Sequence, residues 1–294
     1  MARVTSSAKW FLFAVKADDR RRAAYGRWHD RIHGREIAAR RAAAAELAAT
    51  PLVIPAATGH RSCAPDALAD VATVVAETRR LRATARPADD AKPYLTDYPV
   101  TVDDPASPLL RFALSDQVLV PAARYLGMVP ILTMITILES PAAPNGTPAG
   151  SQLFHCDWED RRQVKVFVHC SDVAAENGPL TAVTAEASGH VKAAVHYRYG
   201  GPNFRLADSD VERVAGTADV TAFAGPAESV TFIDTSSCLH FGSRMLPGAE
   251  ARLVLQFQYL TPSAFDLQLA GRGGRPFAGV PGAFRPVQRL ALGK

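Results

Sequence analysis

The stretch Phe154-His155-Cys156-Asp157 carries the strongest signal in this chain, because a histidine and an aspartate one residue apart point to the same side of an extended strand. A second histidine, His240, follows 83 residues after Asp157. Two imidazoles and one carboxylate can hold a divalent iron on one face and leave the opposite face open for chemistry. The pattern predicts the metal site of an oxygen-using metalloenzyme, with His155, Asp157 and His240 as ligands.

Length and composition are those of a globular protein with a substantial core. The chain has 294 residues and 48% hydrophobic residues, so it can bury roughly three quarters of its unfolded surface. Its longest early apolar run, Trp10–Val15, is too short for a membrane span or a signal peptide. The four cysteines form no Cys-x-x-Cys pair. We therefore expect a cytoplasmic protein with reduced thiols and no membrane partner.

The net charge of +4 comes largely from arginines in the first third of the chain. These arginines lie at 20–22, 40–41 and 79–80, without interleaved aromatic residues. Such runs are more typical of solvated helix faces than of a nucleic-acid interface. We expect a small-molecule substrate and no nucleic-acid partner, and the sequence leaves the oligomeric state open.

The N-terminal part, residues 1–128, is predicted to be mainly helical. Residues 34–48 are almost all strong helix formers, and apolar residues recur at helical spacing over 68–81. A further helix is predicted over 115–126, ended by Gly127. Between these helices, Leu52–Pro55 is β-like and 86–108 is predicted to be an irregular connection.

Residues 129–262 are predicted to form a β-core, with strands at 131–138, 163–170, 229–233 and 252–259. In the segment 163–170, Gln, Lys, Phe and His alternate with Val, Val, Val and Cys, which predicts an antiparallel strand between a core and a polar space. The pattern favours a barrel or jelly roll in a mainly β protein with flanking helices.

Two long segments are less regular, and no linker divides the chain. Residues 186–227 are predicted to be a pocket-lining insertion with a small helix at 208–214. The tail, 263–294, is rich in glycine and proline and is predicted to be irregular. We therefore expect a single domain over 1–294.

The order of these features resembles the phytanoyl-CoA dioxygenase-like family of Fe(II)/2-oxoglutarate oxygenases, over about residues 108–262. The features that carry the resemblance are, in chain order, a helix ending in Tyr125-Leu126-Gly127, the His155-x-Asp157 pair, the strand Lys165–Val168, the turn Asp172-Val173, the motif Glu176-Asn177-Gly178-Pro179-Leu180, the strand Phe232–Thr235, His240, and Arg252 ahead of Tyr259.

The resemblance implies a double-stranded β-helix, with His155, Asp157 and His240 as catalytic iron ligands and Arg252 as the partner of the C5 carboxylate of 2-oxoglutarate. Arginine suits that role because its planar fork donates two charge-assisted hydrogen bonds to a carboxylate. The implied reactants are Fe(II), 2-oxoglutarate and O2, with oxidative decarboxylation to succinate and CO2 coupled to oxidation, usually hydroxylation, of the substrate. Because Asp157 is present where halogenating relatives have a small residue, halogenation is not expected.

The chain departs from the family pattern at two places. Residues 184–190 replace the usual Pro-Gly-Ser-His, and Arg252 lies twelve residues after His240, about one more than expected. Arg244 is therefore a competing candidate for the carboxylate clamp, although Arg252 is favoured because it begins a β-run. Arg244 is otherwise expected to contact a substrate or brace the loop.

Several further residues are candidates for the cavity, each with a structural alternative. Thr133, Thr136 and Lys165 could contact 2-oxoglutarate, although β-propensity alone would also explain the threonines and a solvated charge the lysine. Trp158 could wall the substrate pocket or pack in the core. His169 could border the pocket, but a structural or exposed role is favoured. Cys156 is expected to point away from the iron by strand alternation.

Three functions remain open from the sequence. The leading one is an Fe(II)/2-oxoglutarate-dependent oxygenase that acts on a small molecule in secondary metabolism. The second is a cupin-like metal-dependent dioxygenase or isomerase that does not use 2-oxoglutarate. The third is a non-catalytic β-helix binding protein.

Overall fold

Nine strands form two antiparallel sheets in this computed structural model, which describes residues 19–89, 92–143, 146–269 and 274–294. The predicted mainly β architecture with flanking helices is confirmed. The apolar run Trp10–Val15 lies outside the described residues. The larger sheet has the order β1 (His60–Cys63), β7 (Val230–Ile233), β4 (Val164–His169), β9 (Arg252–Leu260), β3 (Ile131–Ser140) and β2 (Thr96–Pro99). The smaller sheet has the order β6 (Val220–Ala222), β5 (Thr181–Val183) and β8 (His240–Phe241).

The larger sheet separates a hydrophobic core from a cavity, as the alternation in β4 predicts. Val164, Val166 and Val168 belong to the main hydrophobic core, whereas Lys165 and His169 line the cavity. Because successive side chains on a strand point to opposite faces, one strand serves both the core and the cavity. The register of β4 with β9 aligns the two strands so that their cavity-facing residues lie together.

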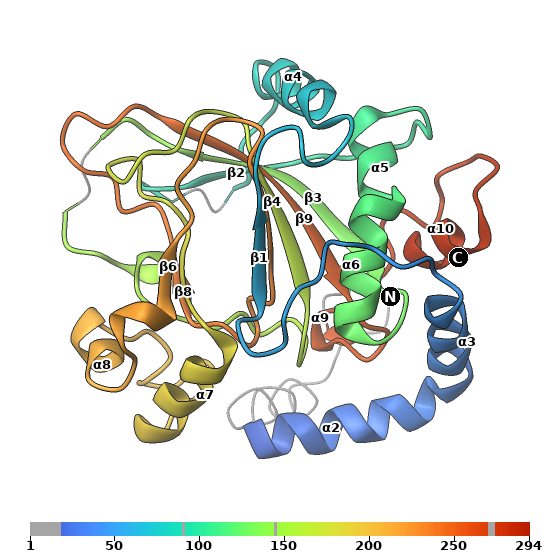
Figure 1. Cartoon of the computed structure of the whole chain (residues 1–294), viewed down its shortest axis with the longest axis horizontal. Helices are drawn as coiled ribbons and strands as arrows, with labels where there is room; N and C mark the ends of the chain where they lie inside the picture. The colour runs from blue at the N-terminus through green and yellow to red at the C-terminus, as the bar shows by residue number, and fades with distance from the viewer. Residues whose placement is uncertain (1–18, 90–91, 144–145, 270–273) are drawn as a thin grey trace.

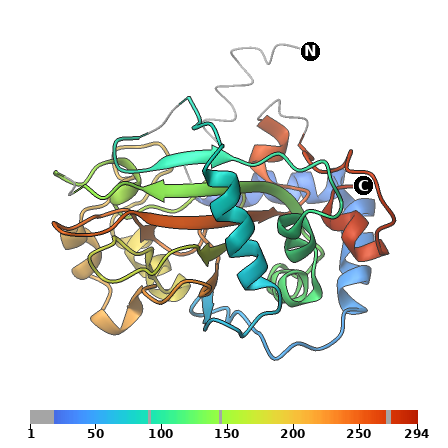
Figure 2. The ribbon, with the colours of Figure 1, turned by 90° about the horizontal axis from the view of Figure 1, so that it is seen from above.

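Helices cover the outer face of the larger sheet (Figure 1). This layer contains α4 (Val71–Arg82), α5 (Pro108–Ala113) and α6 (Asp116–Leu126), whose buried residues share one core cluster with the sheet. Figure 2 shows α4 crossing over the strands. The helix α6 ends at Gly127, which adopts the left-handed conformation that the sequence predicts there (φ 72°).

The N-terminal helices α2 (Asp19–Ile32) and α3 (Gly34–Ala45) correct one sequence prediction, because two of their arginines are buried. Arg40 is fully buried and donates hydrogen bonds to Glu36 and to the carbonyls of Val129, Pro130 and Leu290. Arg22 is buried as well and donates to the carbonyl of Asp160. These guanidinium groups therefore fasten the helices to distant parts of the chain instead of facing solvent.

The structure also differs from the prediction in its short elements. Residues Leu52–Pro55 form no strand, and the edge strands β1 and β2 come instead from segments with little hydrophobic pattern. The tail includes α9 (Phe265–Leu269) and α10 (Pro286–Ala291), although it was predicted to be irregular. The insertion contains α7 (Ala185–Ala194) and β6 in addition to α8 (Asp208–Glu212), which matches the predicted small helix. Among the described helices, none has the length and apolar character needed to cross a membrane.

Candidate metal centre and its cavity

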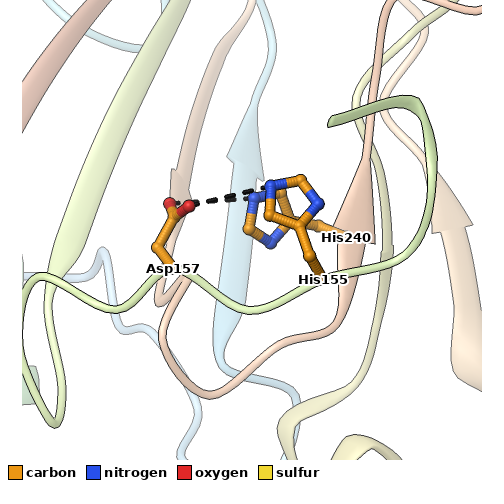
Figure 3. A group of neighbouring side chains, drawn as sticks. All are labelled: His155, Asp157 and His240. Atoms are coloured by element: carbon orange, nitrogen blue, oxygen red, sulfur yellow. Dashed lines mark ion pairs between the residues drawn. The ribbon is translucent and has the colours of Figure 1, made fainter. Parts of the chain in front are cut away.

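His155, Asp157 and His240 line the cavity, and their side chains point toward one another although they come from separate segments (Figure 3). A pair of backbone hydrogen bonds between His155 and His240, of 3.0 and 2.9 Å, forms an isolated antiparallel bridge. This bridge brings the two ring centroids to 4.4 Å. A further bond from the Asp157 amide to the Thr235 carbonyl, of 2.8 Å, fixes the backbone that carries the carboxylate.

The spacing of the three side chains suits a divalent ion. The Nε2 atom of His155 lies 3.8 Å from Oδ1 of Asp157, and Nε2 of His240 lies 3.7 Å from Oδ2. Ligand atoms about 2.1 Å from a shared ion and at right angles to one another lie about 3 Å apart. A small inward movement of the side chains would therefore complete coordination by all three residues.

Both imidazoles are held in the tautomer that metal binding requires. Nδ1 of His155 donates to the Leu153 carbonyl at 2.9 Å, and Nδ1 of His240 donates to the Cys238 carbonyl at 3.0 Å. With the proton on Nδ1, the Nε2 lone pair faces Asp157. Burial lowers the pKa of both histidines, most strongly that of His155. Both rings are therefore neutral at physiological pH, which is the form that ligates metals.

Lys165 bonds directly to the carboxylate of the group. Its Nζ atom lies 2.7 Å from Oδ2 of Asp157 and 3.9 Å from Oε1 of Glu159. Burial alone would raise the pKa of Asp157, but the Lys165 charge and the two imidazoles lower it far below its usual range. Lys165 is thus neither solvated nor free for a cosubstrate carboxylate, because in this structure it neutralises Asp157.

The cavity has a volume of about 300 Å³ and contains Arg252. Arg252 is buried and donates to the Gly178 carbonyl and, at 3.2 and 2.9 Å, to the hydroxyls of Ser140 and Ser243. These bonds use three of the five N–H groups of a guanidinium. The buried Nε atom has no hydrogen-bond partner among the described residues, so Arg252 retains donor capacity.

His169 and Thr136 line the cavity, but Thr133 does not. A β-bulge between Leu132 and Met134 interrupts the alternation of β3, and the Thr133 hydroxyl instead bonds Gln258 at 3.0 Å. The placement of His169 differs from the structural or exposed role favoured by the sequence. Burial, followed by the Arg252 charge, lowers its pKa to about 4.

Arg244 and Trp158 lie outside the residues that line the cavity. Arg244 forms a bidentate ion pair with Asp208 at 2.7 and 2.8 Å, and its guanidinium carbon lies 3.4 Å from the centroid of the Phe241 ring. It therefore braces α8 against the loop that follows β8. Trp158 packs against hydrophobic residues on both sides, and Cys156 is fully buried away from the cavity.

Sequence reasoning missed several residues of the cavity wall. Arg205 and Phe223 come from the insertion at 186–227, whereas Glu159 follows Asp157 at a spacing of two. The period of two could have indicated Glu159. Arg205 lies in an irregular segment, and no sequence pattern points to its position.

No family model matches the chain, and no curated protein matches it. Among solved structures, EctD from S. alaskensis with bound Fe is similar with a TM-score of 0.51 at 15% identity, covering 74% of this chain and 80% of EctD. The epimerase SnoN, in complex with Fe3+, alpha ketoglutarate and nogalamycin RO, has a TM-score of 0.47 at 20% identity, covering 75% and 84%. HygX from Streptomyces hygroscopicus, with nickel and 2-oxoglutarate bound, has a TM-score of 0.46 at 19% identity, covering 70% and 84%.

The likeness to EctD concerns the fold. Together with the two facing antiparallel sheets, it confirms the predicted double-stranded β-helix. At this identity, membership of the phytanoyl-CoA dioxygenase-like family is not established. Among the described residues, one group of three metal-ligating side chains lies close enough to share an ion, and it consists of His155, Asp157 and His240.

Proposed function

We propose that this protein is an Fe(II)/2-oxoglutarate-dependent oxygenase that hydroxylates a small molecule, in secondary metabolism and in the cytoplasm. The observation that carries the proposal is the pairing of two neutral imidazoles, each with its Nε2 lone pair toward the Asp157 carboxylate. Such a triad leaves several positions of an iron ion open. When bound, Fe(II) would supply a site where a 2-oxo acid and O2 react to give an oxidant.

The remaining residues of the cavity have roles that suit this chemistry. Arg252 offers its unpartnered Nε–H, beside the hydroxyls of Ser140 and Ser243, to the C5 carboxylate of 2-oxoglutarate. Thr136 and His169 border the same space and would contact the cosubstrate or shield it from water. Burial of these groups strengthens each charge-assisted hydrogen bond.

One observation favours a second candidate, a cupin-like metal-dependent dioxygenase or isomerase that does not use 2-oxoglutarate. The guanidinium of Arg252 already donates to three protein oxygens, on Gly178, Ser140 and Ser243. An arginine with three hydrogen-bond acceptors on the protein would also serve as a purely structural link between the loop after β8 and the end of β3. In that case the substrate itself would chelate the metal.

An anaerobic titration separates the two candidates. Addition of 2-oxoglutarate to the Fe(II)-loaded protein is expected to produce a metal-to-ligand charge-transfer band. In Arg252→Met the band should require at least about tenfold more 2-oxoglutarate, since a charge-assisted pair of hydrogen bonds is lost. Arg244→Met, which removes a guanidinium outside the cavity, is the matched control and should titrate like the wild type. Retained iron without any band would exclude the 2-oxoglutarate mechanism and support the second candidate.

A further inference from the structure

Arg205 reaches the cavity from the long insertion between β5 and β6. The next residue, Leu206, pairs with Phe154 through two backbone hydrogen bonds of 3.1 and 2.9 Å. Because Phe154 immediately precedes His155, this bridge fixes the insertion directly beside the metal ligands. Arg205 is thus held at a defined place next to the reacting centre, although no regular element carries it.

The guanidinium of Arg205 is influenced by the charges of Asp157 and Glu159. Its carbon lies 4.5 Å from the centroid of the Phe204 ring, and its Nη1 atom is buried without a hydrogen-bond partner among the described residues. No described carboxylate lies within ion-pair distance of it. A buried donor without an acceptor costs stability, so a ligand that supplied an acceptor to this Nη1 atom would bind favourably.

The charged side chains that line the cavity have a net charge of +1, which favours the binding of one more anion. Its lining contains four basic side chains (Lys92, Lys165, Arg205 and Arg252) and three carboxylates (Asp97, Asp157 and Glu159). A divalent metal and the dianion 2-oxoglutarate cancel each other, so they leave this surplus of one positive charge unchanged. Lys165 is occupied by Asp157, and Arg252 is assigned to the cosubstrate. Of the two remaining basic side chains, Lys92 is exposed to solvent, whereas Arg205 has a buried Nη1 atom without a described partner. Arg205 is therefore the better placed of the two to bind a charged group of the substrate.

We propose that Arg205 binds a carboxylate of the substrate, so that the protein acts on small carboxylic acids. This inference rests on the proposed function, because it assumes that the metal and 2-oxoglutarate occupy the rest of the cavity. The fork of an arginine matches a carboxylate, and burial of Nη1 strengthens the bond. The apolar residues that line the same cavity, which include Leu95, Leu138 and Phe223, would contact the apolar part of the substrate.

The test compares acids with their uncharged amides. The protein is loaded with Zn2+ and 2-oxoglutarate, and ligand-observed NMR measures the binding of benzoate, phenylacetate, cinnamate and indole-3-acetate against the four primary amides. We expect at least one acid to bind about tenfold or more tightly than its amide. Arg205→Met should abolish the preference, and Arg205→Lys should retain part of it. Arg213→Met, which removes an exposed arginine of the same insertion, should behave as the wild type.

A wild type without any acid preference, or a preference that survives in Arg205→Met, would overturn the inference. The anaerobic charge-transfer titration is run on Fe(II)-loaded samples of the same proteins to separate this from a failure of the proposed function. A normal band in wild type and Arg205→Met, together with no acid preference, overturns only the role of Arg205. Loss of the band in both proteins rejects the proposed function itself.

Discussion

The ammonium group of Lys165 lies 2.7 Å from Oδ2 of Asp157, the carboxylate that faces both imidazoles of the candidate metal centre. Lys165 sits on β4, whereas Asp157 lies in the segment before it, and both are largely buried. In the metal-free protein, this lysine supplies the positive charge that a buried carboxylate needs. A divalent ion bound at the same carboxylate would compete with that charge.

Substitution of Lys165 should therefore affect the metal-free and metal-bound proteins differently. We expect Lys165→Met to lower the free energy of unfolding of the metal-free protein by about 3 kcal/mol, because it leaves Asp157 without its cation. Saturating Ni2+ should restore most of this loss, so the metal-induced rise in Tm should exceed that of the wild type. Thermal unfolding with and without Ni2+ measures both effects, with Arg213→Met as the control for lost charge. An equal loss in both states would contradict this role.

The buried guanidinium of Arg40 should be a main attachment of α3. Arg40→Leu leaves Glu36 and three carbonyl groups without this donor, so it should lower the free energy of unfolding by about 3 kcal/mol. The adjacent Arg41 is exposed, and Arg41→Leu should change it by less than about 0.5 kcal/mol. Urea denaturation provides the measurement. Similar effects of the two substitutions would show that the burial of Arg40 is not important for stability.

The stability of the protein should depend on pH through His169. Its pKa is about 4 in the folded protein because of burial and the Arg252 charge, against about 6.5 in the unfolded chain. Between these values the unfolded state binds the additional proton, so stability is lost as the pH falls from about 6.5 to 4. His169→Gln should reduce this loss by up to about 3 kcal/mol. Urea denaturation at pH 7 and pH 4.5 compares the two proteins, and parallel losses would contradict the assignment.

Gly178 should be required for the position of Arg252. It has a φ of +58°, and a Cβ atom there would lie 2.5 Å from the Arg244 amide nitrogen. Because its carbonyl accepts a bond from Arg252, Gly178→Ala should displace the guanidinium and weaken 2-oxoglutarate binding several-fold, with iron retention unchanged. Gly189 in α7 has open space around it, so Gly189→Ala should leave the affinity intact. The charge-transfer titration measures both variants, and equal affinities would exclude this role of Gly178.

The sequence was sufficient for the central strands and for the three candidate ligands. The alternating pattern of β4 predicted which of its side chains face the core and which face the cavity. The spacing of His155 and Asp157 predicted that both side chains lie on the same side of the chain. The edge strands β1 and β2 could not be predicted in this way, because His-Arg-Ser-Cys and Thr-Asp-Tyr-Pro have no hydrophobic alternation. They are specified by pairing with β7 and β3, which is a tertiary effect.

The positions of individual side chains in the cavity were harder to predict than the strands that enclose it. The bulge in β3 turns Thr133 away, and a bulge leaves no reliable mark in a single sequence. The bond between Lys165 and Asp157 depends on how two segments meet, as does the position of Arg205 beside the metal ligands. In each case the chemistry follows from contacts between distant residues and not from a local pattern.

The most direct test of the account is the iron content of the reconstituted protein. Wild type and His240→Ala are incubated with Fe(II) under anaerobic conditions, freed of unbound metal, and analysed by atomic emission. If His155, Asp157 and His240 share one ion, the wild type should retain about one iron per chain and the variant almost none. A wild type that retains no iron, or a variant that retains as much as the wild type, would contradict the central claim.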